Sequence, residues 1–129
     1  MAKDWVGIGQ EIAIAFAKNG CKKLFLADIG EPGLEKTKSL VQEISPDAKV
    51  ILHKTDVSSD PSVQDMVNQC IQGFGRIDFA CNNAGIAMSN VPSVEVSMET
   101  FDKVHNVNLK GVSSARSHGL FELGTLGAG

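Results

Sequence analysis

The stretch Asp78-Phe79-Ala80-Cys81-Asn82-Asn83-Ala84-Gly85 decides how the rest of this chain is interpreted. Its apolar part, Phe79 to Cys81, predicts a short buried strand, and the two amides with the Ala-Gly step predict a turn at its end. Each amide carries a donor and an acceptor, so the turn can tie strands together and meet a polar ligand, while Gly85 lets a ligand lie against the backbone. Alone, the stretch fits equally well a strand that runs into an ordinary Asn-Gly type turn.

Composition restricts the class of protein. The 129 residues, 43% of them hydrophobic, suffice for one globular core. The net charge of −3 and the scattered basic residues argue against a nucleic-acid or anionic-membrane partner. No apolar run approaches the roughly 20 residues of a membrane span, and the N-terminus lacks a signal-peptide core, so we expect an intracellular, cytoplasmic protein. Three cysteines and three histidines lack ligand spacing, which predicts no metal site and makes Cys21, Cys70 and Cys81 small buried hydrophobes.

Helix and strand patterns alternate along the chain. Apolar spacing and stop signals predict strands over 23–27, 50–52 and 79–81 and helices over 8–18, 32–44, 60–74 and from Met98, where Ser97 is a candidate N-cap. Strands that alternate with helices favour parallel pairing through right-handed crossovers. The fold class predicted is therefore α/β with a parallel sheet.

A glycine pair and an acidic residue stand at positions typical of a nucleotide site. Gly7-Ile8-Gly9 opens the first helix, where free N–H groups and the positive end of the helix dipole attract a phosphate, although such a pair is common. Asp28 follows the next strand, 19 positions beyond Gly9, at the spacing of a carboxylate that accepts both ribose hydroxyls of an adenosine. The alternative is that Asp28 merely starts the turn before Gly30.

Two further polar residues have open interpretations. Asp56, before Val57, could accept from the exocyclic amine of a purine or could cap local backbone. Asn108 shares a helical face with Phe101, Val104 and Val112, so it is either a satisfied core amide or a site residue.

From Gly7 to Val112 the chain resembles the short-chain dehydrogenases/reductases, which transfer a hydride between a nicotinamide cofactor and an alcohol or carbonyl. The resemblance implies a Rossmann-like doubly wound parallel sheet and a set of cofactor-binding positions: the end of the phosphate loop at Gly7, Ile8 and Gly9, the ribose-binding acid of NAD-preferring members at Asp28, the adenine contact at Asp56 and Val57, and the Asn-Asn-Ala-Gly motif at Asn82, Asn83, Ala84 and Gly85. Asn108 matches the catalytic helix Asn that holds a water in the proton relay.

The chain departs from the family pattern at both ends. The first glycine of the phosphate loop falls on Lys3, its Thr on Ala2, and Trp5 stands where small residues are usual. The first strand of the family sheet, ordered 3-2-1-4, would precede this loop, and we expect its neighbours to lack hydrogen-bond partners, at about 1–3 kcal/mol for each buried group. The chain contains no Tyr, so the Tyr and Lys of the proton relay have no counterparts, and Ser113 and Ser114 precede the strand that would carry the catalytic Ser.

Two hypotheses from different classes follow. The chain derives from an oxidoreductase with NAD as cofactor, preferred over NADP because of Asp28, and an alcohol or carbonyl as substrate in the complete family; we expect weak cofactor binding and no catalysis by this polypeptide. Alternatively, it is a non-catalytic nucleotide-binding or interaction fragment, or the product of a truncated gene model. We predict a partial NAD(P)-binding Rossmann-like domain over 1–116 and a Gly-rich disordered tail over 117–129.

Overall fold

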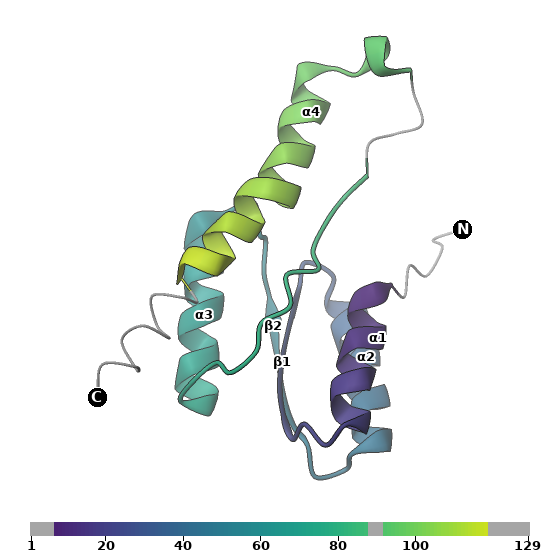
Figure 1. The fold of residues 1–129 in the computed structure, drawn as a ribbon, viewed down its shortest axis with the longest axis vertical. Helices are drawn as coiled ribbons and strands as arrows, with labels where there is room; N and C mark the ends of the chain where they lie inside the picture. Colours follow the sequence, from purple (N-terminus) through teal and green to yellow (C-terminus); the bar gives the residue numbers. More distant parts are fainter. Residues whose placement is uncertain (1–6, 88–91, 119–129) are drawn as a thin grey trace. The chain divides into compact units, whose positions relative to one another are not determined.

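A computed structural model describes residues 7–87 and 92–118 (Figure 1). The chain forms two compact units, residues 1–55 and 56–129. The described residues do not include the three positions at which the chain departs from the phosphate-loop pattern, Ala2, Lys3 and Trp5. They also leave out most of the predicted tail. Ser117 and His118, the first two residues of that tail, are helical.

The first unit has the order helix, strand, helix, strand: α1 (Ile8–Lys18), β1 (Lys23–Asp28), α2 (Glu31–Ile44) and β2 (Lys49–Lys54). The strands pair in parallel, from Lys23 opposite Lys49 to Asp28 opposite Lys54, which confirms the predicted parallel pairing. Figure 1 shows α1 and α2 side by side against this two-stranded sheet.

The core of the first unit lies where both helices meet the sheet. It is formed by buried apolar side chains of α1, β1, α2 and the turn before β2: Ala13, Ala17, Leu24, Val41 and Ala48. The small residues of α1 let the helix approach the sheet closely, and Val41 on α2 has no exposed surface. At the opposite end of the strands from Asp28, Lys22 Nζ donates to Ser45 Oγ (2.9 Å) and to Asp47 (2.7 Å). These bonds join the start of β1 to the turn before β2.

Sequence signals account for the helix ends of the first unit. Gly20, at φ +88°, reverses the chain after α1, which only glycine does without strain. Pro32 lies in the first turn of α2, where its missing N–H costs nothing because that group has no partner within the helix. The predicted bounds of both helices are therefore confirmed within a residue.

All the regular secondary structure in the described part of the second unit is helical. It contains α3 (Asp60–Phe74), the 3-10 turn η1 (Ser93–Glu95), α4 (Met98–His105) and the π-helix η2 (Asn106–Gly111), after which an α-helical segment continues to His118. Gly75, in the left-handed conformation at φ +84°, ends α3. Ser97 Oγ accepts from the Thr100 N–H (3.1 Å), which confirms Ser97 as the N-cap of α4.

The predicted strand over 79–81 is wrong. Residues 79–87 form no regular strand, and the Phe79 side chain is 81% exposed. A parallel strand needs a neighbour to complete its hydrogen bonds and cover its side chains. β1 and β2 are the only strands in the part of the chain that the structure describes, and they pair with each other.

The prediction that all three cysteines are buried is also wrong in part. Cys21 and Cys70 are half-buried, whereas Cys81 is exposed because the segment that carries it is not covered as a central strand would be.

Among residues 7–87 and 92–118, no helix combines the length and the apolar character that crossing a membrane requires.

Candidate functional site

The glycine pair lies at the start of α1, as the sequence predicts. Gly7 is the N-cap with extended backbone angles (φ −91°, ψ −173°), and no side chain caps the helix. The Gly7 carbonyl accepts from the Gln10 N–H (3.0 Å), so the first turn is regular. The N–H groups of this turn therefore point outward without a side-chain acceptor, which is the arrangement that attracts an anion.

Asp28 ends β1 and is exposed. Its Oδ1 accepts from the Gly30 N–H (2.7 Å), and its main-chain oxygen accepts from the N–H of buried Thr55 (2.9 Å). A Cβ at position 30 would lie 3.3 Å from Asp28 Oδ1, so glycine lets the chain turn tightly around the carboxylate. Asp28 thus starts a turn, as one interpretation had it, and no described residue hydrogen-bonds its second carboxylate oxygen, which can accept from a ligand.

Asp56 and Val57 open the second unit. Asp56 Oδ1 accepts from the Ser58 N–H (2.9 Å) and from Ser58 Oγ (2.6 Å), and these two bonds hold the pKa of this carboxyl below its ordinary value. The Asp56 N–H donates to Ser62 Oγ (3.0 Å), which ties the turn to the first residues of α3. Asp56 therefore caps local backbone, and its contact with adenine stays a prediction.

Asn108 fastens the segment that follows Asn82, Asn83, Ala84 and Gly85. Asn108 Oδ1 accepts from the Ile86 N–H and Asn108 Nδ2 donates to the Ile86 oxygen, both at 2.8 Å. Asn108 is exposed, so it is not a core amide; its side chain satisfies the backbone of Ile86 instead. The four motif residues are themselves exposed, and a Cβ at Gly85 would lie 3.5 Å from Asn108 Oδ1.

The π-helical turn brings together residues that sequence reasoning missed. Gly111, buried at its end, lies so close to the turn at Val57 that a Cβ there would be 2.6 Å from the Val57 oxygen. One and two helical turns further on, Ser114 and His118 both hydrogen-bond Asp60 Oδ1, His118 at 3.1 Å. These two hydrogen bonds hold the pKa of Asp60 below its ordinary value, and the bond from Ser114 has the larger effect. An isolated glycine within a helical pattern was the one signal available for this packing.

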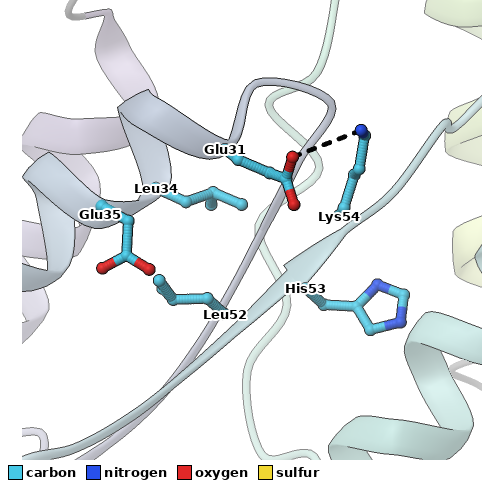
Figure 2. A pocket seen from close by; sticks show the side chains of 6 residues that line it. All are labelled: Glu31, Leu34, Glu35, Leu52, His53 and Lys54. Carbon is cyan, nitrogen blue, oxygen red and sulfur yellow. Dashed lines mark hydrogen bonds and ion pairs between the residues drawn. The ribbon is translucent and has the colours of Figure 1, made fainter.

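A shallow cavity of about 230 Å³ lies elsewhere in the first unit (Figure 2). Leu34 and Leu52 form its apolar part, and Glu31 and Lys54, paired at 3.4 Å, lie beside it. None of the predicted site residues lines this cavity. Its volume is below the roughly 300–1,000 Å³ of typical ligand pockets, so it is not the candidate site.

Comparison with known proteins gives a consistent result. The family model described as Enoyl-(Acyl carrier protein) reductase matches residues 2–120. Levodione reductase of Leifsonia aquatica is 41% identical over 106 residues, which cover 82% of this chain and 39% of the relative.

Solved structures agree with the sequence comparison. A crystal structure of levodione reductase has a TM-score of 0.87 at 38% identity and matches 90% of this chain and 45% of its own. NAD+-bound xylitol dehydrogenase has a TM-score of 0.87 at 27% identity, with coverages of 95% and 46%. The F189W actinorhodin polyketide ketoreductase with NADPH has a TM-score of 0.84 at 30% identity, with coverages of 95% and 45%.

The chain spans less than half the length of these relatives. Its parallel α/β unit and its match to the family over residues 2–120 agree with the order of its motifs. The chain belongs to the short-chain dehydrogenase/reductase family.

Proposed function

We propose that this sequence comes from an NAD-dependent oxidoreductase of small alcohols or carbonyls, and that residues 1–116 form a partial dinucleotide-binding domain of that enzyme. The bound dinucleotide would supply the hydride chemistry. The 129-residue chain does not complete the reaction by itself.

The observation that carries the proposal is the state of Asp28. Its carboxylate stands exposed at the carboxyl end of β1, where ligands of parallel α/β sheets bind, and one oxygen is fixed by the Gly30 N–H at 2.7 Å. That bond orients the carboxylate and leaves the second oxygen for a ribose hydroxyl.

The other cofactor positions would have distinct tasks. Gly7, Ile8 and Gly9 would bring the first N–H groups of α1 to the pyrophosphate, and Asp56 and Val57 would contact the adenine. Asn82, Asn83, Ala84 and Gly85 would border the nicotinamide half, with Asn108 holding the segment behind them through Ile86.

The preference for NAD over NADP rests on charge. A carboxylate at the ribose accepts from both hydroxyls of NAD, whereas the 2′-phosphate of NADP would bring a second negative charge against Asp28. Lys54, opposite Asp28 in the parallel register, is paired with Glu31 at 3.4 Å. We therefore expect NADP to bind more weakly than NAD.

Loss of catalysis follows from the side chains available. General acid–base catalysis in this family's chemistry needs a phenol whose proton is transferred to or from the substrate oxygen, and the chain contains no Tyr. Ser114 does not replace the family's catalytic Ser, because its hydroxyl is hydrogen-bonded to Asp60.

A turnover assay tests the proposal. The purified 129-residue chain is incubated with NAD+ and a broad panel of alcohols, and with NADH and a panel of carbonyls, while NADH absorbance is followed. We expect no turnover above the buffer control, and reproducible turnover that co-purifies with the chain would contradict the proposed loss of catalysis.

A further inference from the structure

The strongest unexplained contact in the second unit is the one between Gly111 and Val57. Gly111 is buried, and a Cβ built on it would lie 2.6 Å from the Val57 oxygen, 3.0 Å from its Cβ and 3.1 Å from its carbonyl carbon. The Val57 backbone would have to move by about 0.8 Å to reach an ordinary contact of 3.4 Å. Backbone cannot turn aside as a flexible side chain can, so only glycine is compatible with this approach.

The same helix makes further contacts on both sides of Gly111. Ser114 and His118 hydrogen-bond Asp60, three residues beyond Val57, while Asn108 binds the Ile86 backbone at both ends of its amide. The segment 108–118 thus touches the turn at 57–60 and the segment at 86. The turn begins at Val57, to which we assign an adenine contact, and Ile86 directly follows Gly85, to which we assign a contact with the nicotinamide half.

The π-helical geometry of η2 suits this role. A π-turn widens the helix by one residue per turn, and such turns are frequent at functional sites because they re-aim side chains on either side. Here the wide turn spans Asn106–Gly111, with Asn108 within it and Gly111 at its end.

We propose that Gly111 is a positioning residue for the nucleotide: η2 sets the position of the Asp56–Val57 turn through the Gly111 contact. The proposal rests on the proposed function, because it assigns Asp56 and Val57 to adenine. Gly111 itself contacts no cofactor.

The test compares two glycine-to-alanine variants of the 129-residue chain. Gly111→Ala adds a methyl group against the Val57 oxygen, whereas Gly33→Ala adds one within α2, where nothing lies within 4 Å. Each substitution replaces a glycine within a helix by alanine, which favours helix formation. Their difference therefore isolates the contact with Val57.

The first measurement uses nucleotide-free protein and amide NMR spectra. We expect Gly111→Ala to shift the Val57 and Ser58 signals while the signals of α3 beyond its first two turns stay in place, and Gly33→Ala to leave both regions unchanged. Unchanged Val57 and Ser58 signals in folded Gly111→Ala would overturn the inference. If Gly111→Ala does not fold, Ser114→Ala removes the neighbouring bond to Asp60 without adding atoms and must shift the same turn.

The second measurement is an NAD+ titration of both variants. We expect Gly111→Ala to bind about threefold to tenfold more weakly than Gly33→Ala, because adenine meets a displaced turn. Equal affinities of the two variants would refute the positioning role, since an effect on packing alone does not change nucleotide binding. Absence of any NAD+ response in the unmodified chain would refute the proposed function instead, and the nucleotide-free spectra would still decide whether η2 sets the turn.

Discussion

The amide of Asn108 can be tested by removing it. Asn108→Ala deletes two hydrogen bonds of 2.8 Å, one to the N–H and one to the oxygen of Ile86. A neutral hydrogen bond contributes about 0.5–1.5 kcal/mol net, so the pair holds the segment by about 1–3 kcal/mol. Because Asn108 is exposed, water replaces part of this and the lower half of the range applies.

Hydrogen exchange at the Ile86 amide measures this loss directly. The range of about 1–3 kcal/mol corresponds to an exchange rate about 5 to 150 times faster, and the lower half of that range gives an expected acceleration of about 5 to 30 times. Asn108→Asp tests the two bonds separately, because a carboxylate still accepts from the Ile86 N–H but repels the Ile86 oxygen.

The control is Asn106→Ala, which removes another side-chain amide from the same π-helix. Within the described residues, the Asn106 side chain makes no hydrogen bond. Exchange at Ile86 should differ between Asn108→Ala and Asn106→Ala by the full predicted factor. If the two variants exchange at the same rate, Asn108 does not fasten this segment and the geometry deduced for the site is wrong.

Three further predictions concern stability and reactivity. Val41→Ala, at a core position with no exposed surface, should lower the free energy of unfolding by about 2–3 kcal/mol in urea titrations, whereas Val94→Ala, 90% exposed in η1, should change it by less than about 0.5 kcal/mol. Because hydrogen bonds from Ser114 and His118 hold the pKa of Asp60 below 3.8, its ionised form stabilises the fold above that value, and this contribution is lost as the pH falls through the depressed pKa. Asp60→Asn should therefore flatten the loss of stability on acidification. Exposed Cys81 should react with iodoacetamide faster than half-buried Cys70, whose thiol pKa is raised by desolvation, and equal rates in peptide mass spectra would contradict the burial described.

The elements that the sequence predicted well are those specified by local signals. Pro61 after Asp60 and Gly75 at the end mark the bounds of α3, and Ser97 caps α4 as predicted. The parallel pairing of β1 with β2 follows from the helix between them, since a crossover of this length returns the chain in the same direction. These features depend on residues close together in the chain.

The features that failed or were missed depend on distant residues. Apolar Phe79 to Cys81 has the composition of a buried strand, but composition cannot supply the neighbouring strand, and Phe79 is 81% exposed. The partner of Asn108 is 22 positions away and is a backbone group, which no side-chain pattern reveals. The contact of Gly111 with Val57 likewise joins segments more than 50 residues apart.

The site residues divide in the same way. The spacing from Gly9 to Asp28 predicted a carboxylate at the end of a strand, and the structure places one there. The spacing could not show that Gly30 fixes one of its oxygens, because this bond depends on how tightly the chain turns after β1. Asp56 was equally ambiguous until its bonds to Ser58 were known.

An NAD+ titration of the isotope-labelled 129-residue chain, followed by amide NMR, tests the central claim most directly. We expect saturable shifts at Asp28, Gly30, Val57 and Ser58, with a dissociation constant near about 1 mM because the first glycine of the phosphate loop is replaced by Lys3. Asp28→Asn should abolish the shifts at Gly30 that NAD+ produces. Shifts confined to other residues, or none up to about 10 mM NAD+, would contradict the adenosine site. A dissociation constant near about 1 μM would contradict the weak binding expected from Lys3 in the phosphate loop.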